Sequence, residues 1–122
     1  MDRKIHNENE KLQEINKNLY QISEKQVQNQ RNIIENEQSE QHFMEISKKC
    51  TRLFDRLFCA WNKDKEFANW LNQENTELLH NKQQITFDLE KQREALHHDK
   101  RRLNEMEDDL YNERRSLLRG KK

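Results

Sequence analysis

The stretch AWNKDKEFANW, residues 60–70, lies at the midpoint of the 122-residue chain and separates two long polar segments of helical composition. Within it, Asn62 tolerates a left-handed backbone, and Asp64 can cap a helix that carries Glu66 in its first turn. We therefore predict a bend over residues 61–64, which joins one helix over about residues 5–60 to another over about residues 65–119.

Composition supports helices on both sides of this bend. The chain has no proline and one glycine, and 31% of its residues are hydrophobic whereas 38% are charged, which leaves too little apolar material for a large core. The expected fold is all-α: residues 1–122 form a single domain, an elongated, coiled-coil-like antiparallel two-helix hairpin. The alternative is one uninterrupted helix that dimerises.

Apolar residues recur at heptad-like spacing in both arms. The first arm begins with the stripe Ile5, Leu12, Ile15, Leu19, Ile22 and Ile33. A shift of phase then leads to a second stripe, Phe43, Ile46, Cys50, Phe54, Leu57 and Trp61. The second arm has leucines at strict sevens, with other apolar residues on the neighbouring core position: Leu89, Leu96, Leu103, Leu110 and Leu117, then Leu71, Leu78, Ile85 and Met106.

Folding the chain at the bend matches these stripes layer by layer. The predicted pairs are Leu19 with Met106, Ile22 with Leu103, Phe43 with Ile85, Cys50 with Leu78, and Leu57 with Leu71. The same pairing lays an acidic N-terminal arm along a basic C-terminal arm, so exposed ion pairs between the arms are expected to add modest stability.

Aromatic residues concentrate on either side of the bend, and several of them do not fit the internal stripe. We interpret these as a second apolar surface that another helical chain covers, because exposed Trp and Phe are typical anchors of interfaces. The predicted partner-binding residues are Leu53, Phe58, Trp61, Phe67, Trp70, Leu79 and Phe87. The alternative is a thick end of the hairpin that closes on itself.

Catalytic and metal-binding chemistry has little support in the sequence. The Glu-x-x-His pairs Glu77/His80 and Glu94/His97 have the spacing of di-iron ligands, but they lie about 25 Å apart on one helix. No phosphate loop or nucleophile motif is present, so we expect no enzyme, no metal and no cofactor. Without an apolar leader or membrane span, the chain is expected to be cytoplasmic, and any export would use a route without a cleaved signal.

Two segments carry a resemblance to a known group of proteins. The tryptophan at the bend, in Trp61-Asn62-Lys63, resembles the WXG-type small proteins of Gram-positive type VII secretion. More closely, LFCAWNKDKEFANWL (57–71) with LNEMEDDLYNERRSLL (103–118) resembles the small helical partners of LXG polymorphic toxins. The resemblance covers about residues 43–118, and it implies binding to the long helical N-terminal LXG domain, often beside a second small hairpin.

Two departures from the WXG pattern matter. Lys63 stands where those proteins have glycine, and Tyr111 is followed four residues later by Arg115 in place of the acidic residue of their export signal. We therefore expect a non-enzymatic adaptor or targeting chaperone whose toxin partner supplies the signal and with which it could be exported. The alternatives are a self-associating coiled-coil scaffold, for which a homodimer would suffice, and a nucleic-acid-binding rod that uses its basic C-terminal arm.

Overall fold

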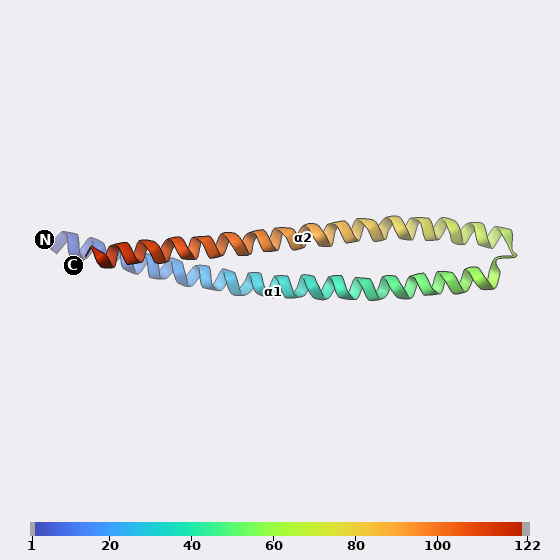
Figure 1. Cartoon of the computed structure of the whole chain (residues 1–122), viewed down its shortest axis with the longest axis horizontal. Helices are drawn as coiled ribbons and strands as arrows, with labels where there is room; N and C mark the ends of the chain where they lie inside the picture. Colours follow the sequence, from blue (N-terminus) through green and yellow to red (C-terminus); the bar gives the residue numbers. More distant parts are fainter. Residues whose placement is uncertain (1, 121–122) are drawn as a thin grey trace. The chain divides into compact units, whose positions relative to one another are not determined.

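The computed structural model describes residues 2–120, which form an all-α helical hairpin. Helix α1 spans Asp2–Trp61 and helix α2 spans Lys65–Arg119 (Figure 1). The predicted hairpin is therefore confirmed, and the single uninterrupted helix is excluded because the helical backbone stops after Trp61.

Backbone hydrogen bonds and one side-chain cap define the bend. The Asp64 amide donates to the Trp61 carbonyl at 3.1 Å, and the Phe67 amide donates to Asp64 Oδ1 at 3.1 Å. Asp64 is thus the N-cap of α2, as predicted, since its side chain satisfies an amide that has no acceptor within the helix. No residue from 2 to 120 has a positive φ, so the bend does not use the left-handed conformation that Asn62 would tolerate, and Lys63 occupies it without strain.

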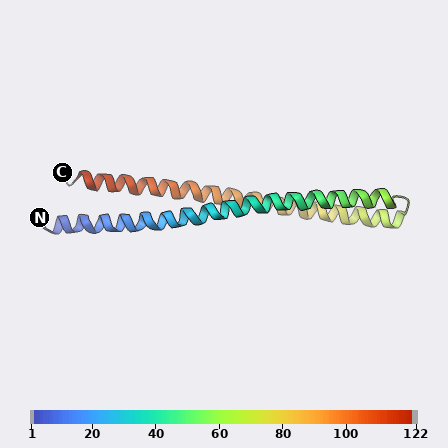
Figure 2. The same ribbon diagram turned by 90° about the horizontal axis from the view of Figure 1, so that it is seen from below.

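The structure divides into two compact units, which we call the terminal unit and the tip unit. The terminal unit comprises residues 2–33 of α1 and 95–120 of α2, and the tip unit comprises residues 34–94, including the bend. Within each unit a segment of α1 lies antiparallel to a segment of α2; in the tip unit, Figure 2 shows them as the green and yellow ribbons that meet at the bend.

The terminal unit has the better buried core of the two. Its buried hydrophobic residues are Ile15, Ile22, Ile33 and Leu103. Buried Asn29 donates from Nδ2 to the Leu96 carbonyl at 3.0 Å, which gives the same register as the predicted pair of Ile22 and Leu103. This part of the predicted pairing is therefore confirmed.

The tip unit has a sparse core. Among its described residues Leu71 is the one buried hydrophobic side chain, at 2% exposure, whereas Phe43 and Cys50 are half-buried. Phe43, Cys50, Leu78 and Ile85 line one hollow between the helices, so the predicted pairs of Phe43 with Ile85 and Cys50 with Leu78 are confirmed.

Helix α1 keeps one heptad register, so the predicted phase shift is wrong. Its inward-facing residues follow at strict sevens, and two of them are asparagines: Ile15, Ile22, Asn29, Asn36, Phe43, Cys50 and Leu57. The asparagines interrupt the apolar stripe in the sequence without interrupting the helix face. Ile46, which had been assigned to the inner stripe, is exposed.

Polar contacts between the helices include one ion pair of the expected kind, between Glu40 of the acidic N-terminal arm and Arg93 of the basic C-terminal arm. In the terminal unit, Arg114 Nη1 donates to Asn16 Oδ1 at 3.3 Å, and Gln26 Nε2 donates to Asn104 Oδ1 at 3.1 Å. These contacts use amide oxygens where carboxylates were expected. Among the described residues, this ion pair between α1 and α2 lies in the tip unit.

Neither helix over residues 2–120 contains a segment that is both long enough and apolar enough to cross a lipid bilayer.

Candidate partner-binding surfaces of the tip unit

The tip unit leaves most of its large hydrophobic side chains in contact with solvent. Of the sixteen exposed large hydrophobic residues in the described chain, ten belong to this unit, which buries only Leu71. The terminal unit buries four such residues and exposes six. An open apolar surface next to a sparse core is typical of a protein–protein interface.

Three aromatic rings pack in series beside the bend. The centroids of Trp61 and Phe67 lie 5.5 Å apart, and those of Phe67 and Trp70 lie 5.7 Å apart, distances typical of favourable aromatic pairs. Trp61 remains 53% exposed, so its predicted place on the inner stripe is wrong. The three rings support one another, and the side chains of Trp61 and Trp70 remain exposed to solvent.

The seven predicted partner-binding residues do not form one surface. Because residues seven apart share a helix side, Ile46 and Leu53 flank one side of the inner row of α1, whereas Met44 and Phe58 flank the other. We call the first side the aromatic face; its residues are Ile46, Leu53, Phe67 and Trp70. We call the second the groove face; its residues are Met44, Phe58, Leu79 and Phe87.

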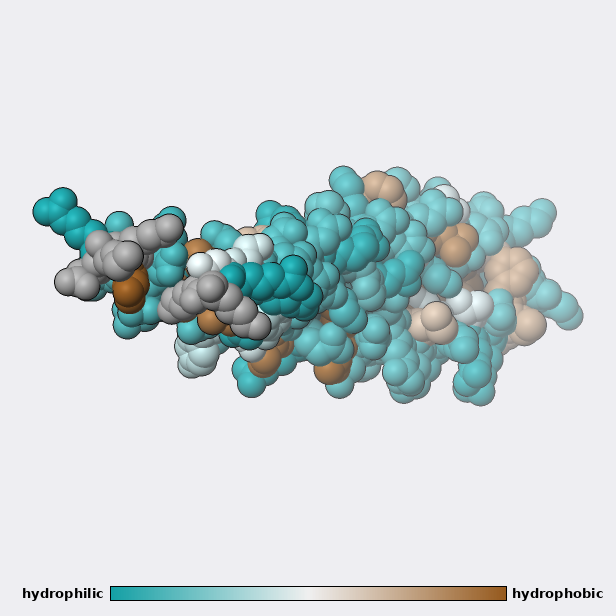
Figure 3. All heavy atoms as spheres, turned by 60° about the vertical axis from the view of Figure 1, so that its left-hand side comes forward, coloured by the Kyte–Doolittle hydropathy of each residue, from teal (hydrophilic) through white to brown (hydrophobic). Residues whose placement is uncertain are grey.

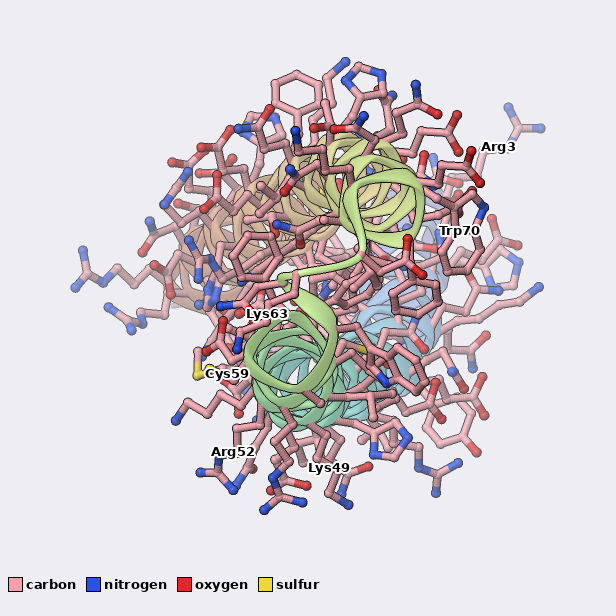
Figure 4. All side chains as sticks on the ribbon, turned by 90° about the vertical axis from the view of Figure 1, so that its right-hand side faces the viewer. Arg3, Lys49, Arg52, Cys59, Lys63 and Trp70 are labelled. Carbon is pink, nitrogen blue, oxygen red and sulfur yellow. The ribbon has the colours of Figure 1, made fainter. Side chains whose placement is uncertain are left out.

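Figure 4 views the hairpin from the end that carries the bend. Trp70 projects from one side of the helix pair, and Cys59, which follows Phe58 in α1, projects from the opposite side. The predicted partner-binding residues therefore divide between two surfaces, where the sequence suggested one. Met44 was missed, although its spacing of fourteen residues from Phe58 places both on one side of α1.

Hollows between and beside the helices lie along the groove face. The first, of about 420 Å³, is lined by Phe43, Met44 and Leu89 together with polar side chains. A second, of about 510 Å³, lies beside Phe58 and Leu71, and a third, of about 380 Å³, lies beside Leu79 and Phe87. Such hollows can receive side chains from another helix, since helices pack by inserting ridges into grooves.

Polar atoms interrupt the core beside the first hollow. Arg93 Nη1 lies 3.2 Å from Glu40 Oε2, and Asn36 Nδ2 donates to the Leu89 carbonyl at 3.4 Å and to Gln92 Oε1 at 3.3 Å. The other oxygens of the two side chains, Glu40 Oε1 and Asn36 Oδ1, are buried without a hydrogen-bond partner in the described chain. Buried oxygens without donors lower the stability of the folded state.

Comparison with known families places the whole hairpin in one group. The sequence profile of a single family matches residues 10–117, a range that includes the bend and nearly all of both helices. The chain belongs to the DUF3958 family. That family is described as proteins of unknown function, so membership by itself assigns no activity. No match was found among curated proteins or among solved structures.

Metal-ligating residues in this DUF3958 chain are dispersed. Within residues 2–120, no group of three or more His, Cys, Asp or Glu side chains is arranged to hold a metal ion. Cys50 and Cys59 are free thiols, the first half-buried and the second exposed. The features of this DUF3958 tip unit that call for a functional explanation are therefore its two apolar faces.

Proposed function

We propose that this chain is a non-enzymatic adaptor or targeting chaperone that binds a helical partner on the groove face of the tip unit. The observation that carries the proposal is the contrast between a core with one buried hydrophobic residue, Leu71, and the hollows and exposed apolar side chains beside it. A partner helix would supply the apolar atoms that the tip unit lacks.

The class of partner follows from the resemblance of residues 57–71 and 103–118 to LXG-associated proteins. On this proposal the partner is the helical N-terminal LXG domain of a polymorphic toxin, which the adaptor keeps folded for type VII secretion. Helical packing supports such a pairing, because a long LXG helix can lie along the groove face as another helix of a bundle.

Exposure sets the size of the expected effect. Phe58 is 43% exposed and Leu79 is 50% exposed, so a partner can bury roughly half of each side chain. Complete burial of such a side chain contributes roughly 1.5–3 kcal/mol, and the hollows add contacts that truncation would lose. Replacing both residues with alanine should therefore weaken binding by about 2–3 kcal/mol, which corresponds to about 30- to 150-fold.

The test is co-purification and titration of this chain with the LXG domain encoded by a neighbouring gene. Phe58→Ala combined with Leu79→Ala should reduce affinity as stated, whereas Leu118→Ala should not. Leu118 is a matched control, because its exposure is 49% and it lies in the terminal unit. An LXG domain that binds all these variants equally would contradict the groove face as the binding site.

A further inference from the structure

The aromatic face carries a charge pattern that the groove face lacks. On α1, Lys49 and Arg56 flank its apolar residues, and on α2 Glu74 and Glu77 flank them. All four charged residues are exposed or half-buried. In Figure 4, Lys49 extends from the outer side of α1, while Trp70 extends from α2. One edge of this face is therefore basic and the other edge is acidic.

The register of the hairpin sets opposite charges at the same level along the helices. The bend centres on residue 63, and Lys49 and Glu77 each lie fourteen residues from it, so they lie at corresponding heights on α1 and α2. Seven residues nearer the bend, the same register places Arg56 level with Trp70. Each basic residue of α1 thus has a suitable counterpart on α2 at its own height.

A second copy can use this arrangement in only one of two orientations. If the two-fold axis runs parallel to the helices, α1 of each copy faces α2 of the other, and Lys49 meets Glu77 while Arg56 meets the Trp70 ring. If the axis runs across the helices, α1 faces α1, and Lys49 approaches Arg56. Like charges in contact disfavour the second orientation.

We propose that the aromatic face of the tip unit binds a second copy of this chain and forms a four-helix bundle with both bends at the same end. Leu53, 56% exposed, lies between the charged edges, and Trp70, 52% exposed, lies on the α2 edge seven residues from Glu77; both become buried in the bundle. Two Lys49–Glu77 pairs and two Arg56–Trp70 contacts then fix its orientation.

The groove face is unsuited to the same symmetric contact. Lys48 of α1 and Lys82 of α2 line its first hollow together with Glu40, Glu90 and Arg93, so this face has charges of both signs on α2 and lacks the separate basic and acidic edges of the aromatic face. The self-association surface is therefore distinct from the surface proposed for the LXG domain. The proposed self-association does not depend on binding of the LXG domain.

Sedimentation velocity of the full chain over about 1–100 µM tests the proposal. The unchanged chain should sediment as a dimer at the upper concentrations. Lys49→Glu or Glu77→Lys alone should weaken the dimer at least about tenfold, because each change creates two contacts between like charges. The double variant Lys49→Glu with Glu77→Lys should restore the dimer, because it exchanges the two charges symmetrically.

Lys48→Glu is the matched control, because it makes the same change one residue away on the groove side and should leave the dimer unchanged. Phe58→Ala with Leu79→Ala should likewise leave it intact, which separates this test from that of LXG binding. The proposal is overturned if the unchanged chain is a monomer at 100 µM, if Lys48→Glu is as disruptive as Lys49→Glu, or if the double variant fails to restore association.

Discussion

Replacing buried Asn36 with leucine should raise the free energy of unfolding by about 2 kcal/mol. The change removes two long hydrogen bonds from Nδ2, at 3.3 and 3.4 Å, which together contribute roughly 1–2 kcal/mol. It also removes Oδ1, a buried acceptor without a donor, and relieves a cost of roughly 1–3 kcal/mol. Burial of a leucine at a site that is 4% exposed adds roughly 1.5–3 kcal/mol, so the gains exceed the loss.

Urea denaturation followed by circular dichroism at 222 nm measures this difference. With a slope of roughly 1–3 kcal/mol/M, the midpoint should rise by about 1 M. Asn29→Leu is the matched control. Asn29 is also buried, but its Nδ2 donates to the Leu96 carbonyl at 3.0 Å, and neither of its side-chain polar atoms is among the buried atoms without a hydrogen-bond partner. Its gain should be smaller. A less stable Asn36→Leu protein, or a larger gain at Asn29, would show that the unpartnered Asn36 oxygen does not lower the stability of the tip unit.

Three further substitutions test the bend and the core by the same denaturation assay. Asp64→Ala should lower stability by about 1 kcal/mol through loss of the cap to the Phe67 amide, whereas Asp64→Asn should retain most of it. Leu71→Ala should cost about 2–5 kcal/mol and exceed the cost of Leu78→Ala, because Leu78 is only half-buried; equal costs would contradict the assigned core. Lys63→Gly should lower stability by up to about 1 kcal/mol, since the bend uses no positive φ; a more stable protein would contradict this.

The hairpin could be predicted because its determinants are local or periodic. Asp64 caps α2 with its own side chain, and the leucines at strict sevens mark one side of α2. The position of the bend then sets the register of the two helices, and the pairs Phe43–Ile85 and Cys50–Leu78 were correctly predicted from it.

The inner row of α1 could not be predicted from hydrophobicity. Asn29 and Asn36 are buried because their amide groups donate to carbonyls on α2, and a hydrophobic pattern carries no information about such partners. The predicted phase shift in α1 also explains why the two faces were not distinguished. Without a continuous inner row at seven-residue spacing, the sides on which Leu53 and Phe58 lie relative to the core could not be assigned. Once that series is known, the sequence alone places them on opposite sides.

The central claim, that a helical partner covers the groove face, is tested most directly by site-specific photo-cross-linking in the complex with the LXG domain. A photoreactive phenylalanine analogue would replace Leu79 on the groove face, Leu53 on the aromatic face, or Leu118 in the terminal unit, three leucines of similar exposure. We expect cross-links to the LXG domain from position 79, cross-links to a second copy from position 53, and none to the LXG domain from position 118. Cross-links to the LXG domain from position 118 but not from position 79 would contradict this claim.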